Sequence, residues 1–289
     1  MHTARNRKAR KHMDRSERLA RLIGLLADES PQLRAARASS ELAMPAGEEE
    51  RYRLWRSLVN VRQPRPASGT YLQAEDAFLR EEARRKGVVT VEAIRQQAQD
   101  SGTGAAGHVL LWQGDITRLA VDGIVNAANE QLLGCFSPCH SCIDNAIHTQ
   151  AGVRLRLACA ELMRAQGTPE PTGHAKLTAG FNLPAAHVLH TVGPIVAGSR
   201  PTQRDREQLA SCYEACLDAA AEHGLASIAF CCISTGEFRF PKPEAARIAT
   251  STVRTWQQNA ASAGRSVPTV VFDVFTDEDY RIYQRLLEE

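Results

Sequence analysis

Apolar residues recur in two patterns along the chain, and the pattern changes near residue 107. Up to residue 100 they return every three or four positions, as on one face of a helix. This spacing predicts helices over residues 14–27, 48–62 and 72–98. The core that three such helices can build is small, so we expect this part to lean on the rest of the chain or on a partner.

Beyond residue 107, short apolar runs alternate with longer helical patterns. The predicted strands cover residues 109–113, 123–128, 175–178, 187–193, 227–233 and 269–275. The predicted helices cover residues 144–165, 204–222, 243–258 and 277–287. Strands that alternate with helices predict a three-layer α/β domain, in which ligands gather at the carboxyl ends of the strands.

The two parts also differ in composition. Residues 1–104 carry 20 Lys and Arg against 14 Asp and Glu, a balance of +6, whereas residues 105–289 carry 15 against 19, a balance of −4. Residues 101–107 read SGTGAAG, the composition of a flexible linker. We therefore expect a mainly helical N-terminal segment over residues 1–104 and an α/β domain over residues 108–289. The basic run Arg5–Arg21 is typical of a solvated, frayed terminus.

The sequence argues against a membrane protein, because no stretch approaches the roughly 20 apolar residues that a bilayer requires. Arg18 and Arg21 interrupt the early apolar patch that could otherwise act as a signal sequence. All eight cysteines follow residue 134, and their crowding favours reduced thiols over a spaced disulfide framework. These features favour a cytoplasmic location.

Polar and small residues follow three of the predicted strands. These segments are Gly114-Asp115-Ile116-Thr117, Asn126-Ala127-Ala128-Asn129 and Ser234-Thr235-Gly236-Glu237-Phe238. Small residues let a backbone approach a ligand, and amide side chains can both donate to and accept from hydroxyl groups. Backbone N–H groups in a loop before a helix can surround a pyrophosphate. Such loops suit a ligand that carries hydroxyl and phosphate groups.

A loop after the second strand concentrates residue types that bind metals. Cys135, His140 and Cys142 lie within eight residues, with Cys139 between them. Sulfur and imidazole suit Zn²⁺, and three protein ligands leave one coordination position open, as in catalytic sites. If Cys139 were a fourth ligand, the site would be closed and structural. An apolar loop with incidental cysteines is the other interpretation.

Several motifs in this order resemble the macrodomain family, the ADP-ribose-binding module, over about residues 108–289. They are GDIT, NAAN, AIHTQAG, HTVGP and ISTGEFRFP. The segment 134–145, of the form G-C-F-x-P-x-H-x-C-I-D-N, is similar to the zinc-containing macrodomains of bacteria and fungi, which remove mono-ADP-ribose from modified proteins. LWRSLVNVRQP, YLQAED and KGVVT extend the resemblance into the helical segment.

The resemblance implies an α/β/α macrodomain with a mixed central sheet, and a Zn²⁺ cofactor held by Cys135, His140 and Cys142 without Cys139. It also implies a catalytic centre at Asp144, which would guide the attacking water, and Asn129, which would contact the distal ribose. The implied substrate contacts are Asp115, Ile116, Asn126, Asn129, Ser234, Thr235, Gly236, Glu237, Phe238 and Phe275. Among these, Asp115 would accept a hydrogen bond from the adenine amino group, Phe275 would stack on adenine, and Phe238 would cover the distal ribose.

Ordinary structural roles remain open for the same residues. Asp144 can cap the following helix, and Asp115 can stabilise a turn. One asparagine of NAAN can be a helix cap, and Phe238 and Phe275 can belong to the core. His148, His190, Cys159, Cys212 and Cys216 lie on predicted apolar faces and suit core packing.

For the chain as a whole, these observations predict a zinc-dependent hydrolase that removes mono-ADP-ribose from proteins. The alternatives are an ADP-ribose reader without hydrolytic activity and a structural-zinc interaction protein with no nucleotide site. The resemblance further implies a lipoyl-carrier protein as the modified partner and a sirtuin-type transferase as the enzyme that modifies it. Charge alone gives only weak support to a nucleic-acid partner.

Overall fold

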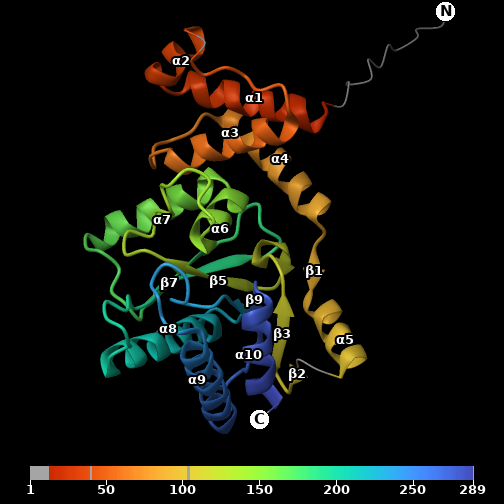
Figure 1. Ribbon diagram of the computed structural model, residues 1–289, viewed down its shortest axis with the longest axis vertical. Helices are drawn as coiled ribbons and strands as arrows, with labels where there is room; N and C mark the ends of the chain where they lie inside the picture. Colours follow the sequence, from red (N-terminus) through yellow and green to blue (C-terminus); the bar gives the residue numbers. More distant parts are fainter. Residues whose placement is uncertain (1–12, 40, 103–104, 289) are drawn as a thin grey trace, which may run out of the picture.

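A computed structural model describes residues 13–39, 41–102 and 105–288, and one large sheet lies at its centre (Figure 1). The strand order in this sheet is β2-β3-β9-β8-β5-β7-β6. The strands are β2 (Ala105–Ala106), β3 (Val109–Gln113), β5 (Gly123–Ala128), β6 (Ala175–Ala179), β7 (His187–Val192), β8 (Ser227–Phe230) and β9 (Thr269–Val274). The two edge strands run antiparallel to their neighbours and the inner strands run parallel, which confirms the mixed sheet.

Helices cover both faces of the sheet (Figure 1). One face carries α6 (Ile143–Ala151) and α7 (Val153–Gln166), and the other carries α8 (Gln203–Glu222), α9 (Lys242–Ser262) and α10 (Asp277–Glu288). Strand β8 is buried at all four positions, as expected for a central strand covered on both sides. The fold is the three-layer α/β/α arrangement that the alternation of strands and helices predicts.

Three of the helices that precede the sheet enclose a second, smaller core. They are α1 (Arg15–Asp28), α3 (Glu48–Val61) and α4 (Gly69–Lys86), whereas α2 (Pro31–Ala38) has no buried residue. Trp55, Tyr71 and Phe78 are almost fully buried at its centre, and Val153 of α7 belongs to the same cluster. The predicted dependence of these helices on the rest of the chain is therefore confirmed.

The connection between the two cores is more structured than the composition suggests. Strand β1 (Val89–Thr90) pairs in parallel with β4 (Leu119–Ala120), next to the 3-10 turn η1 (Ile116–Arg118). Helix α5 (Val91–Ser101) places Ile94 in the main core. The predicted linker includes residues 103–104, which lie outside the described residues, but its next two residues form strand β2 at the sheet edge.

Glycines divide two of the predicted helices. The pattern over 72–98 is interrupted at Gly87 and that over 144–165 at Gly152, with φ of 82° and 88°. Residues other than glycine rarely adopt this backbone conformation. At Gly152 a Cβ atom would also lie 2.8 Å from Glu75 Oε2, so α4 passes too close for a side chain. Apolar spacing continues across both breaks, which is why periodicity alone does not reveal them.

The basic run at the N-terminus is partly ordered. Arg15 contacts Glu82 at 2.8 Å and Arg18 contacts Glu81 at 2.7 Å, both on α4. This part of the run therefore stabilises the helical core and is not the frayed terminus predicted, whereas residues 1–12 lie outside the described residues. Within the described part of the chain, none of the helices combines the length and the apolar character that a membrane span needs.

Candidate active site

A cavity of about 970 Å³ lies where β3, β5, β8 and β9 end. Its volume is in the range of pockets that enclose small organic ligands. Thirteen of the fourteen site residues expected from the sequence line it. They are Asp115, Ile116, Asn129, Cys135, His140, Cys142, Asp144, Ser234, Thr235, Gly236, Glu237, Phe238 and Phe275. Parallel strands thus bring segments from four parts of the chain to one opening.

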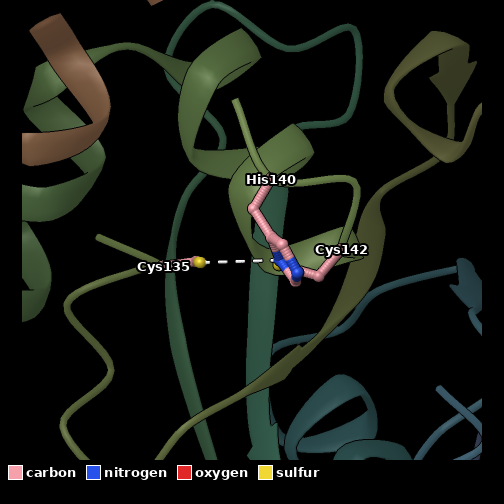
Figure 2. A group of neighbouring side chains, drawn as sticks. All are labelled: Cys135, His140 and Cys142. Carbon is pink, nitrogen blue, oxygen red and sulfur yellow. Dashed lines mark hydrogen bonds between the residues drawn. The ribbon is translucent and has the colours of Figure 1, made fainter. Parts of the chain in front are cut away.

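The metal-ligand loop runs from the end of β5 to the start of α6. The ligand atoms of Cys135, His140 and Cys142 all lie within 4.8 Å of one another, and Figure 2 shows the three side chains converging. Cys135 Sγ lies 3.7 Å from His140 Nδ1, and the opposite ring nitrogen, Nε2, lies 3.5 Å from Glu237 Oε1. Glu237 therefore faces the imidazole from across the cavity, as carboxylates beside metal-bound histidines do.

The donor set fits a zinc ion. Two thiols and one imidazole at this spacing match its preferred ligands and its small tetrahedral radius. Cys139 is directed elsewhere, since its Sγ donates to the Arg53 carbonyl at 3.4 Å. Within the described residues, the group that could hold an ion at this loop therefore has three members, as expected from the resemblance.

A second cluster of His148, Cys159 and His190 lies in the core and serves packing. Asn126 Nδ2 lies 3.2 Å from His190 Nδ1, and Thr178 Oγ1 lies 3.0 Å from His190 Nε2, so both ring nitrogens have partners. Burial lowers the pKa of His190 to about 4 and raises the pKa of Cys159 to about 12. Both side chains are therefore neutral at physiological pH, as the interpretation as core residues requires.

Asp144 is a buried carboxyl group at the start of α6. Cys142 is the N-cap of this helix, and its Sγ accepts a hydrogen bond from the Asn145 N–H, so the interpretation of Asp144 as the cap is wrong. Asp144 Oδ1 instead accepts a hydrogen bond of 2.8 Å from Asn126 Nδ2. Burial raises the pKa of Asp144 to about 6, against the opposing effects of this hydrogen bond and of the Arg156 charge.

Asp115 lines the cavity directly after β3, whereas the metal-ligand loop follows β5. Its Oδ1 accepts from the backbone N–H and the hydroxyl of Thr117, and its Oδ2 lies 3.2 Å from Lys86 Nζ. Burial opposes ionisation, but the Lys86 charge and the bonds from Thr117 outweigh it and lower the pKa of Asp115. The turn-forming role is therefore confirmed, and the carboxylate remains charged at the cavity wall.

The loop after β8 contains two residues with positive φ. Ser234 and Arg239 adopt φ of 65° and 58°, which is uncommon for residues with side chains. Strained backbone of this kind concentrates at ligand-binding sites. Phe238 is half-buried, and Phe275 exposes 78% of its surface, so Phe275 does not belong to the core.

Comparison with known proteins shows which family has this arrangement. The chain matches the Macro domain family over residues 125–249. A protein of Treponema medium named protein-ADP-ribose hydrolase is 46% identical over 275 residues, which cover 95% of this chain and 100% of that protein. This chain belongs to the macrodomain family.

Two solved macrodomains are also similar in structure. The Oceanobacillus iheyensis macrodomain with ADP is 38% identical, with a TM-score of 0.56 over 62% of this chain and 90% of that one. The Trypanosoma brucei macrodomain in complex with ADP-ribose is 34% identical, with a TM-score of 0.56 over 68% of this chain and 76% of that one. Both were solved with ligands of the adenosine diphosphate class.

Asn126 is the one predicted site residue that does not line the cavity of this macrodomain. Its side chain is completely buried between Asp144 and His190. Alternate residues of a strand point to opposite faces, and Asn126 of β5 points into the core. The geometry therefore gives Asn126 a contact that orients Asp144, in place of the expected contact with ribose.

Asn129 lies on the cavity wall and shapes the loop that follows β5. Its Oδ1 accepts from the Gln131 N–H at 3.0 Å and its Nδ2 donates to the Gly134 carbonyl at 3.2 Å, so it stabilises a turn and not a helix end. Gly134 has φ of 81°, and a Cβ there would lie 2.8 Å from the His148 ring. The loop therefore passes directly over this ring, and that path carries it to the metal-ligand cysteines.

Three residues of the N-terminal helices also line the macrodomain cavity, and sequence reasoning missed them. Tyr52 and Arg56 come from α3, and Lys86 comes from the end of α4. Arg56 and Lys86 lie inside LWRSLVNVRQP and KGVVT, the segments that extend the family resemblance beyond the main domain. That resemblance could have indicated that these residues belong to the site. Residue spacing within a helix cannot show which face meets a distant loop.

Proposed function

We propose that this macrodomain hydrolyses the bond between mono-ADP-ribose and a protein side chain. The observation that carries the proposal is the single cavity, which combines a nucleotide-sized binding surface with Asp144 and a metal-ligand loop. The relative named protein-ADP-ribose hydrolase, whose full length matches 95% of this chain, supports the same conclusion. A reader of ADP-ribose would need the binding surface but not the three-ligand loop.

The cavity suggests how the substrate lies. Adenine would occupy the end near Asp115 and Phe275, where a carboxylate can accept from its amino group and an exposed ring can stack on it. The pyrophosphate would lie against the backbone N–H groups of residues 236–238, since the Thr235 N–H already donates to the Cys232 carbonyl. This leaves the distal ribose between Asn129, Phe238 and the metal-ligand loop. The remote contacts would then fix the position of the reacting sugar.

The reaction that we propose is of the glycosidase type. The bond between the anomeric carbon of the distal ribose and the side-chain atom breaks, with positive charge developing on the sugar. Water supplies the oxygen of the new hydroxyl group, and its proton passes to the Asp144 carboxylate or to the departing side chain. Asn126 holds the Asp144 carboxylate in one orientation. Zinc held by Cys135, His140 and Cys142 would supply a Lewis acid that polarises an oxygen of the substrate.

Substitution of Asp144 separates hydrolysis from binding. Because Asp144 handles the water and does not touch the adenosine end, Asp144→Ala should lower hydrolysis by on the order of 10²- to 10⁴-fold. Affinity for free ADP-ribose should change little, and Asp100→Ala, at an exposed position on α5, serves as the control. Hydrolysis is followed by release of free ADP-ribose from a modified peptide, and binding by calorimetry. Full activity of a folded Asp144→Ala protein would remove Asp144 from the mechanism.

Two finer assignments follow from the same proposal. A lipoyl-carrier protein carrying mono-ADP-ribose, the partner implied by the resemblance together with a sirtuin-type transferase, is the natural substrate that we propose to assay first. We also propose a cytoplasmic location, because thiols that hold a metal must stay reduced.

A further inference from the structure

Helix α3 of the N-terminal segment lies against the metal-ligand loop and is bonded to it. The Arg56 guanidinium reaches across from this helix. Its Nη2 donates to the His140 carbonyl at 2.7 Å and to Asn145 Oδ1 at 2.8 Å, and its Nε donates to the same oxygen at 3.2 Å. One side chain thus joins the backbone of one predicted ligand to the first turn of α6.

Asn145 is in turn hydrogen-bonded to two other residues of the loop. Its Nδ2 donates to the Ser137 carbonyl at 3.0 Å, and its backbone N–H donates to Cys142 Sγ at 3.4 Å. Asn145 is completely buried, so its amide has no water to replace a lost partner. The position of the Cys142 sulfur therefore depends on Asn145, and the Asn145 side chain is oriented by Arg56.

The same helix holds the middle of the loop at Cys139. Asn60, which is 1% exposed, accepts from the Cys139 N–H at 2.9 Å and donates to Thr149 Oγ1 at 3.1 Å. The Arg53 carbonyl accepts from Cys139 Sγ at 3.4 Å. Cys139 has φ of 54°, a conformation that residues with side chains adopt only when their surroundings impose it. Contacts from α3 supply that constraint.

Ordering such a loop has a free-energy cost. Each residue that is fixed in one conformation loses chain entropy. If the contacts with α3 impose the loop conformation before the ion arrives, the ion does not have to offset this cost, and its apparent affinity rises. Groups that orient metal ligands typically change metal affinity by about 10- to 100-fold.

We propose that Arg56 is a positioning residue, which together with Asn60 holds the loop 135–142 ready to bind the metal. The N-terminal helices are then part of the metal site and not only a neighbouring domain. This inference rests on the proposed function for the identity of the ion, but not for the geometry of the loop.

The test compares three full-length variants with the wild type. Arg56→Met removes the guanidinium, Arg56→Lys keeps one charged donor, and Arg53→Met removes an exposed arginine of the same helix while keeping the carbonyl that Cys139 contacts. Zinc affinity is measured by competition with a chromophoric chelator, and amide hydrogen exchange of residues 135–145 is measured on metal-free protein. Thermal unfolding of each variant shows that it is folded.

Arg56→Met should bind zinc about 10- to 100-fold more weakly and exchange its loop amides faster, with Arg56→Lys in between and Arg53→Met like the wild type. Wild-type zinc affinity and unchanged exchange in Arg56→Met would overturn the positioning role and leave the proposed function intact. A wild type that fails to bind zinc would instead remove the ion from the proposed function. Loop exchange in the metal-free variants would still decide the role of Arg56.

Discussion

Phe275 combines strong exposure with a position directly after a buried strand. The five residues before it in β9 are buried, whereas Phe275 itself exposes 78% of its surface at the cavity wall. A large exposed aromatic ring contributes little to the core, but its open face is available to a purine base. The ring is therefore better explained by ligand binding than by folding.

Phe275→Ala should separate binding from stability. Loss of a stacked base typically costs about 1–3 kcal/mol, so affinity for free ADP-ribose should fall by roughly 5- to 150-fold. The free energy of unfolding should change by less than about 0.5 kcal/mol. Calorimetry and urea unfolding measure the two quantities. Ile195→Ala is the control, because Ile195 is 62% exposed and does not line the cavity. Equal affinity of wild type and Phe275→Ala would place adenine elsewhere.

For single residues, the sequence predicts which residue types form the site better than it predicts which atoms they contact. Residue types pointed to this loop, and the resemblance singled out Cys135, His140 and Cys142, which the structure brings together. Asn126 shows where this prediction fails. Neighbouring residues of a strand point to opposite faces, so the sequence motif alone does not show that the Asn126 side chain points into the core and not into the cavity. Exposure of Phe275 is likewise a property of the packed structure, and the local pattern of apolar residues places it equally well in the core.

Among the elements, the junction of α6 and α7 depends on a distant helix. Gly152 precedes α7 and provides no side-chain cap, and Glu75 of α4 accepts the Val153 N–H at 2.9 Å instead. Tyr71 donates its hydroxyl to the other Glu75 oxygen at 2.7 Å. Glu75 is completely buried, and burial raises its pKa to about 7, against these two hydrogen bonds. The carboxyl group therefore ionises in the folded protein only at a much higher pH than in the unfolded chain.

The pH dependence of unfolding tests this contact. Between the ordinary pKa of 4.5 and about 7 the folded state holds a proton on Glu75 that the unfolded chain releases. Stability from this group is therefore complete below the lower value and is lost as pH rises through the upper one. Glu75→Gln does not titrate, so its stability relative to wild type should increase by about 3 kcal/mol across this window. A difference that stays constant in urea unfolding at acidic and alkaline pH would contradict the assignment.

The predicted helices and strands match the structure where their ends are set locally. The predicted ranges 48–62 and 243–258 agree with α3 and α9 to within four residues at each end, but the breaks at Gly87 and Gly152 were not predicted. The second of these exists because Glu75 and Asn182 approach the backbone, a contact between parts of the chain far apart in sequence. Helix periodicity carries no information about such neighbours.

Across the whole molecule, the two compositional parts share one site. The basic segment supplies Arg56 and Lys86 to the cavity of the acidic α/β part, and each already bonds to a residue there. Both side chains therefore join the two parts of the protein at the cavity. Composition predicts a boundary near residue 104, but the interface depends on pairs such as Arg56 and Asn145 that only the tertiary structure brings together.

The most direct test of the account is hydrolysis of defined substrates by the full chain. Peptides that carry mono-ADP-ribose on Asp or Glu, on Ser, or on Arg are incubated with metal-free and with zinc-restored protein, and free ADP-ribose is quantified. We predict that the protein releases ADP-ribose from at least one linkage, that chelation abolishes this release, and that zinc restores it. Tight binding of ADP-ribose without release from any linkage would contradict it and identify a reader.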